Sequence, residues 1–197
     1  MHKGRLEAFS DGVLAIIITI MVLEMKAPES TDIKSLLPII PIFLSYILSF
    51  IYVGIYWINH HHIFQAVEKV NSRILWANLN LLFWLSLIPF ATSWLGENHL
   101  SAMPVALYGG VLFISGISYR ILEKTLAKFN NKAETLLKAV EKGKKENVSI
   151  ILYLIAIPAA FLSVFISIAC YIIVAMLWVI PHKKIEEDFK KLEDNLK

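Results

Sequence analysis

The segment that decides the fold is residues 8–23, AFSDGVLAIIITIMVL, in which Asp11 is followed by twelve uncharged and mostly apolar residues. A helix of about 20 such residues is long enough to cross a hydrocarbon core of about 30 Å. Similar stretches recur along the 197-residue chain, which is 57% hydrophobic and 18% charged. Soluble domains are about 45–50% apolar and about 25% charged, so the composition predicts an all-α integral membrane protein.

We predict six transmembrane helices per subunit in a single domain covering residues 1–197. Pro89 and Ser93 are expected to kink the third helix. The last two helices divide residues 148–180, a charge-free stretch of 33 residues that is too long for one untilted span and short for two. A Lys- and Glu-rich soluble helical linker is expected at about 123–147, and a tail at 182–197. The predicted helices cover approximately residues 5–25, 36–59, 74–95, 101–122, 148–160 and 162–180.

The distribution of basic residues predicts the orientation. If the N-terminus, the 60–73 segment, the 120–147 segment and the tail share one side, all 19 Lys and Arg residues lie on that side except Lys26 and Lys34. Cytoplasmic segments of membrane proteins carry such an excess. We therefore expect both termini in the cytoplasm and a multi-pass protein of the cell membrane.

Other features of the composition exclude several kinds of site. Cys170 is the only cysteine, so no intrachain disulfide is possible, and we expect it to pack as a small apolar residue. A net charge of +3 without a basic patch interleaved with aromatic residues gives no reason to expect nucleic acid. No nucleophile, base and oxyanion set is recognisable, so neither an enzyme nor a cofactor is expected.

Asp11 is the polar residue whose presence in the predicted first membrane helix most needs an explanation. A carboxylate in the hydrocarbon core costs about 2.5–3.5 kcal/mol on insertion scales, so Asp11 is either solvated at the interface or paired within the protein. We favour a hydrogen bond from a histidine. Three consecutive histidines on a helix point about 100° apart and cannot share one metal ion. The partner candidates are Asn78, Asn80, Trp76, His60, His61 and His62.

An apolar stripe follows Asp11 on the first helix. Ile16, Ile20 and Leu23 are spaced by four and three residues and share one helix face, with Thr19 beside it. Ordinary packing or lipid contact explains this spacing, and on spacing alone it is the favoured interpretation. The alternative is that the stripe lines a pore, because apolar rings can gate a pore by dewetting.

The first helix also matches a motif. Its residues fit the pattern RxxxFSDxxxAIxxT and closely resemble the signature of the transmembrane protein 175 family, which comprises endosomal and lysosomal potassium channels in animals and shorter prokaryotic relatives. Trp57, Phe64 and the closing residues 178–181 resemble the family as well. The matching motif residues are Arg5, Phe9, Ser10, Asp11, Ala15, Ile16 and Thr19.

The resemblance implies a potassium-selective channel whose pore is lined by the first helix, with no cofactor. Ile16 matches the family's pore constriction, Ile20 and Leu23 match further apolar layers, and Thr19 matches a polar position near which K⁺ passes transiently. A single six-helix repeat implies a homotetramer in the lipid bilayer. The signature implies a packing network whose members are Arg5, Phe9, Ser10 and Asp11, with His60, His61, His62, Trp76 and Asn78 as partner candidates.

Helical geometry divides the signature residues and leaves other functions open. Phe9 lies about 20° from Ile16 around an ideal helix, and is ambiguous between pore and packing, whereas Asp11 lies about 140° away. A proton- or cation-coupled secondary transporter that uses Asp11 and a histidine is the main alternative to a channel. A non-conducting scaffold that binds partners through 123–147 and the tail is another.

Overall fold

The computed structural model describes residues 3–28, 30–65, 67, 69–98, 100–130 and 145–179. Every regular element in this part of the chain is helical. One is a 3₁₀-helix, η1 (Ile33–Ile39), which leads directly into α2. The α-helices are α1 (Lys3–Leu23), α2 (Ile40–Gln65), α3 (Ser72–Leu85), α4 (Ile88–Glu97), α5 (Ala102–Phe129), α7 (Lys145–Ala159) and α8 (Val164–Val179).

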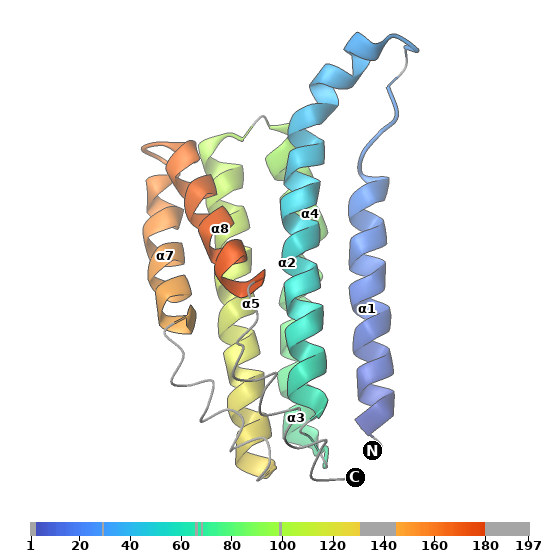
Figure 1. Cartoon of the computed structure of the whole chain (residues 1–197), viewed down its shortest axis with the longest axis vertical. Helices are drawn as coiled ribbons and strands as arrows, with labels where there is room; N and C mark the ends of the chain where they lie inside the picture. Colours follow the sequence, from blue (N-terminus) through green and yellow to red (C-terminus); the bar gives the residue numbers. More distant parts are fainter. Residues whose placement is uncertain are drawn as a thin grey trace.

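The helices form a bundle in which α1 and the α7–α8 pair lie at opposite edges (Figure 1). α1 packs on α2, α3 and α4, whereas α5 contacts α3, α4, α7 and α8. The helices alternate in direction, so that α1 and the α3–α4 pair run one way and α2 and α5 run the other. Lys3, Gln65 and Phe129 consequently lie near one end of the bundle.

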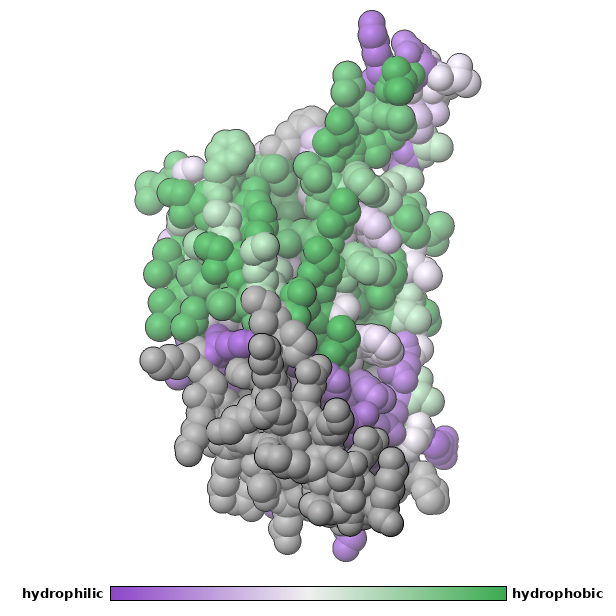
Figure 2. Space-filling model, viewed as in Figure 1, coloured by the Kyte–Doolittle hydropathy of each residue, from purple (hydrophilic) through white to green (hydrophobic). Residues whose placement is uncertain are grey.

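Four segments are long and apolar enough to cross a membrane, namely Lys3–Leu23, Ile33–Gln65, Ser72–Glu97 and Ala102–Phe129. Apolar side chains cover the middle of the face shown in Figure 2, and hydrophilic residues gather toward its ends. α7 and α8 have 15 and 16 residues and rise about 23 Å each, which is less than the thickness of a hydrocarbon core of about 30 Å.

The predicted third helix is broken into α3 and α4, which meet at Ser86 and Leu87. Pro89 lies in the first turn of α4. Proline has no N–H to donate to the carbonyl four residues earlier, and its ring clashes with that carbonyl, so the regular helix ends at Leu85. The kink predicted at Pro89 is therefore confirmed, whereas Ser93 lies inside α4 and does not mark the break.

Three other helix boundaries differ from the predicted ones because the helices are longer than expected. α2 continues to Gln65, so the three histidines lie on this helix and not in the connecting segment expected after residue 59. α5 continues to Phe129, and α7 begins at Lys145, so both ends of the predicted linker are helical. The rest of that linker, 131–144, and the tail, 182–197, lie outside the described residues.

The two-helix interpretation of residues 148–180 is confirmed by the α7–α8 hairpin. Ser167 Oγ donates to the Ala156 carbonyl across the hairpin at 2.6 Å. Tyr171 anchors it to α5, because its hydroxyl donates to the Val105 carbonyl at 3.1 Å. A Cβ atom at Gly109 would overlap that hydroxyl, so the glycine makes room for the tyrosine.

Candidate pore-lining helix and its supporting networks

One face of α1 packs against the bundle, and the opposite face is exposed on the surface of the subunit. Its buried residues recur every three or four positions, as expected for one face of a helix. They include Ser10, which is fully buried although it is polar. The bundle-facing residues are Leu6, Ser10, Leu14, Ile17 and Met21.

The predicted stripe lies on the outward face. Ile16, Ile20 and Leu23 are 57%, 41% and 77% exposed in the isolated chain. Thr19 is exposed beside them, and its hydroxyl donates to the Ile16 carbonyl at 2.9 Å. Phe9 is also exposed and therefore belongs to the outward face. In a membrane, such a face contacts lipid, another subunit or the inside of a pore.

A buried hydrogen-bonded relay, called the inner relay below, holds the N-terminal half of α1 to α2 and α3. Asn78 Nδ2 donates to Ser10 Oγ at 2.9 Å, and Ser10 Oγ donates to the Leu6 carbonyl at 2.9 Å. The amide oxygen of Asn78 lies 2.8 Å from His60 Nε2. Since an amide oxygen can only accept, His60 carries its proton on Nε2. The imidazole also stacks on Phe64 at 4.4 Å between ring centroids.

Asp11 does not join this relay. It accepts a hydrogen bond from Trp57 Nε1 at 3.0 Å, so the predicted bond from a histidine is wrong. The reason is the rotation of about 100° between adjacent helical residues: Ser10 faces the bundle, and Asp11 faces the seam with α2. Trp57 stacks beside His61, with ring centroids 6.5 Å apart.

The remaining signature candidates lie away from these contacts. Trp76 is 73% exposed and is not a partner of Asp11. Arg5 is exposed, and His62 is partly buried. Asn80 donates to Ser118 Oγ at 2.9 Å and links α3 to α5. Of the partner candidates, only His60 and Asn78 lie in the relay with Ser10.

A second buried polar relay, called the outer relay below, lies beside the C-terminal half of α1 and was not anticipated from the sequence. Ser49 Oγ lies 2.7 Å from Thr92 Oγ1 and 3.0 Å from the Tyr108 hydroxyl. Thr92 Oγ1 also lies 3.9 Å from the sulfur of Met21. The sequence signal for this relay is a serine or threonine inside a long apolar helix. The signal is unspecific, because many such residues hydrogen-bond only to the backbone of their own helix.

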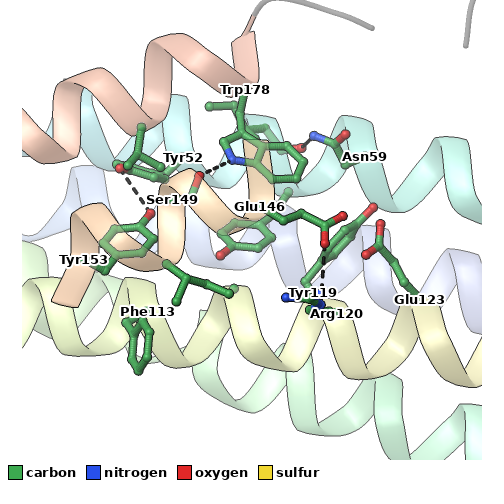
Figure 3. Close-up of a pocket in the computed structure, with 15 residues that line it drawn as sticks. Tyr52, Asn59, Phe113, Tyr119, Arg120, Glu123, Glu146, Ser149, Tyr153 and Trp178 are labelled. Carbon is green, nitrogen blue, oxygen red and sulfur yellow. Dashed lines mark hydrogen bonds and ion pairs between the residues drawn. The ribbon is translucent and has the colours of Figure 1, made fainter. Parts of the chain in front are cut away.

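A cavity of about 60 Å³ lies between α2, α5, α7 and α8 (Figure 3). Arg120 Nε lies 3.5 Å from Glu146 Oε2, and Trp178 Nε1 donates to Ser149 Oγ at 2.9 Å. An apolar cavity that holds benzene measures about 150 Å³, whereas one water needs about 10–15 Å³. The cavity is therefore too small for an organic ring and large enough for a few waters. We interpret the cavity as part of the packing interface between the α7–α8 hairpin and α5.

No described residues form a metal site of the usual kind, because no three His, Cys, Asp or Glu side chains converge there. The features that stand out are therefore the exposed apolar face of α1 and the polar relays behind it. A helical bundle with several apolar spans and such an edge helix is typical of an integral membrane protein in which α1 contacts lipid, another subunit or the inside of a pore.

Comparison with known proteins identifies the family. Residues 5–89 match the family described as the endosomal/lysosomal potassium channel TMEM175. A potassium channel of Chryseobacterium sp. strain P1-3 is 56% identical over 191 residues, which are 97% of this chain and 100% of that protein. A potassium channel of Chamaesiphon minutus is 31% identical and is covered over 94% of its length. The chain belongs to the TMEM175 family, as its signature predicted.

A solved structure agrees with this membership. The crystal structure of a lysosomal potassium-selective channel TMEM175 homolog from Chamaesiphon minutus superposes with a TM-score of 0.76 at 31% identity, covering 90% of this chain and 96% of that one. The human endosomal/lysosomal proton channel TMEM175 is 31% identical over 183 residues, but the match covers only 36% of that longer protein. The matches therefore span most of the two bacterial channels and about a third of the human protein.

Proposed function

We propose that this protein is a potassium-selective channel in which α1 helices from several copies surround the pore. The observation that carries the proposal is the apolar stripe at Ile16, Ile20 and Leu23, which is exposed on an edge helix whose opposite face is fixed by buried contacts. The bacterial relatives named as potassium channels support the same function. Channels need no catalytic residues or cofactor, and the chain is not an enzyme.

The pore needs more than one copy of the chain, because a single α1 cannot enclose a path. A homotetramer with α1 on the fourfold axis would bring the Ile16 side chains together as the narrowest ring. Ile20 and Leu23 would form apolar layers on the outer side of that ring. K⁺ would pass transiently near Ile16 and Thr19, and an apolar ring of this kind closes the pore by dewetting until the helices separate.

The subunit would have six membrane-crossing segments, counting α3 and α4 as one, with both termini in the cytoplasm of a cell whose plasma membrane holds the channel. The short α7 and α8 would cross with help from local thinning or from adjacent protein. The basic residues support this orientation, because Arg73 and Lys128 lie near the ends of α3 and α5 that share one side.

A carrier that uses Asp11 and a histidine has less support, because Asp11 bonds Trp57 and not a histidine. Proton conduction is a second candidate. The human relative is named a proton channel, and His60 lies in a buried relay that ends on α1. Flux measurements with a pH gradient can be made on the same samples as the potassium measurements.

The test replaces Ile16 with alanine or asparagine in protein reconstituted into liposomes. Both changes widen or hydrate the ring, so K⁺ flux should rise severalfold and the ratio of K⁺ to Na⁺ flux should fall. Ile151→Ala is the matched control, because Ile151 is 56% exposed on α7 and is remote from α1. Wild-type flux and selectivity in both Ile16 variants would contradict the assignment of the constriction.

A further inference from the structure

The outer relay has a single consistent direction of donation. Thr92 Oγ1 lies 2.7 Å from the Ile88 carbonyl, which can only accept, so the Thr92 hydrogen points there. Ser49 then donates to Thr92, and Tyr108 donates to Ser49. The three side chains come from α4, α2 and α5, and each is at most 3% exposed. The relay therefore fixes the rotation of α4 against two neighbouring helices.

α1 rests on this relay through Met21. The Met21 side chain is 2% exposed, and its sulfur contacts Thr92 Oγ1 at 3.9 Å. Because the Thr92 hydrogen is already used, this contact is one of packing against a fixed oxygen. Ser93, the next residue, donates to Glu24 Oε2 at 3.4 Å. One packing contact and one hydrogen bond therefore hold the outer end of α1 to α4.

The inner half of α1 is held differently. Ser10 is bonded by Asn78 of α3, and α3 is separated from α4 by the break before Pro89. The two halves of α1 thus rest on two different helices. Asn78 lies beside Ser10, and Thr92 lies beside Met21. Interpolation between these two contacts along the parallel helices places the α3–α4 break about level with Ile16.

On the basis of the pore assignment proposed above, we infer that Thr92 is a positioning residue for the outer half of the pore-lining helix. Held by Ser49 and Tyr108, it sets where Met21 sits. Ile20 and Leu23 lie on either side of Met21 along α1 and face outward, so a shift of Met21 changes how far they project. The inner relay, which contains the signature serine, does not control this half.

The test uses Thr92→Val, which keeps the shape of the side chain and removes the hydroxyl. Ser49 then loses its acceptor and Met21 its fixed contact. We expect K⁺ flux through reconstituted full-length protein to rise roughly fivefold, the factor that corresponds to one neutral hydrogen bond, and K⁺ over Na⁺ selectivity to fall. Thr92→Ser restores the hydroxyl and should return both values to wild type.

Ser118→Ala is the matched control. Ser118 is a buried hydroxyl on α5 that accepts from Asn80 at 2.9 Å, and the bond lies between α3 and α5. The control should lower the melting temperature about as much as Thr92→Val while leaving flux and selectivity unchanged. If the two variants change flux equally, or if Thr92→Val leaves flux at the wild-type value, the positioning role is refuted.

A second readout separates this role from the channel function itself. Nitroxide labels at Leu23→Cys, in a Cys170→Ser background, report distances between copies at the outer end of α1. Thr92→Val should broaden these distances and Ser118→Ala should not, whether or not the protein conducts. Absent wild-type flux would overturn the channel proposal, whereas unchanged distances would overturn the positioning role. If Thr92→Val does not fold, Ser49→Ala is expected to give the same changes and decides the question.

Discussion

Buried polar side chains in this protein end their hydrogen-bond chains on backbone carbonyls. The inner relay runs from His60 through Asn78 to Ser10 and the Leu6 carbonyl, and the outer relay ends on the Ile88 carbonyl. Each donor in these chains has an acceptor, which matters because an unmet donor in a region without water is costly. Among the described residues, Ser115 Oγ is buried and has no hydrogen-bond partner.

Because Asn78 is hydrogen-bonded and Ser115 Oγ is not, we expect different effects on stability when each is replaced by an apolar residue. Asn78→Leu removes the acceptor of His60 and leaves its Nε2–H orphaned, which should lower the free energy of unfolding by about 1–3 kcal/mol. Ser115→Ala removes a hydroxyl that bonds nothing and should be neutral or slightly stabilising. Thermal unfolding in detergent measures both. Equal melting temperatures for the two variants would show that the inner relay does not stabilise the fold.

At the scale of the helices, close contact between α2 and α4 depends on one glycine. A Cβ atom at Gly96 would lie 2.7 Å from Ile42 Cα, and a backbone atom cannot move aside as a flexible side chain can. Gly110 on α5 has nothing within 4 Å of the same position. The two positions therefore separate the effect of close packing from the helix propensity of glycine.

We expect Gly96→Ala to destabilise the protein by about 1–3 kcal/mol, the usual cost of overpacking a filled site. Gly110→Ala should instead stabilise it by up to about 1 kcal/mol, because alanine is the better helix former. Unfolding in a graded detergent mixture gives both values. A neutral Gly96→Ala variant would mean that α2 and α4 can separate at this point without loss.

The break between α3 and α4 shows how far sequence reasoning reaches at this scale. A proline in a long apolar stretch predicts a kink for a local reason, its missing N–H and the clash of its ring, and the kink is present. α2 was predicted to end before His60, and the apolar part of α5 was predicted to end before Glu123, with a soluble helical extension after it. Both side chains are buried by neighbouring helices instead.

For the whole molecule, the charge distribution predicts a topology that labelling can measure. In a Cys170→Ser background, an impermeant maleimide added to intact cells should label Lys34→Cys and should label Lys128→Cys only after permeabilisation. Both lysines are exposed, and they lie at opposite ends of the bundle. The background without an added cysteine is the control, and the reverse pattern would place the termini outside the cell.

The sequence by itself determined the membrane class, most of the helices and the family. These depend on local properties: the length of apolar runs, a proline, and a compact motif within residues 5–19. Only the tertiary structure decided the polar partners. Ser10 and Asp11 are adjacent in sequence, yet one meets Asn78 and the other Trp57, because about 100° of helix rotation sends them to different neighbours. The outer relay joins residues 43 and 59 positions apart, and such pairings depend on how the helices pack.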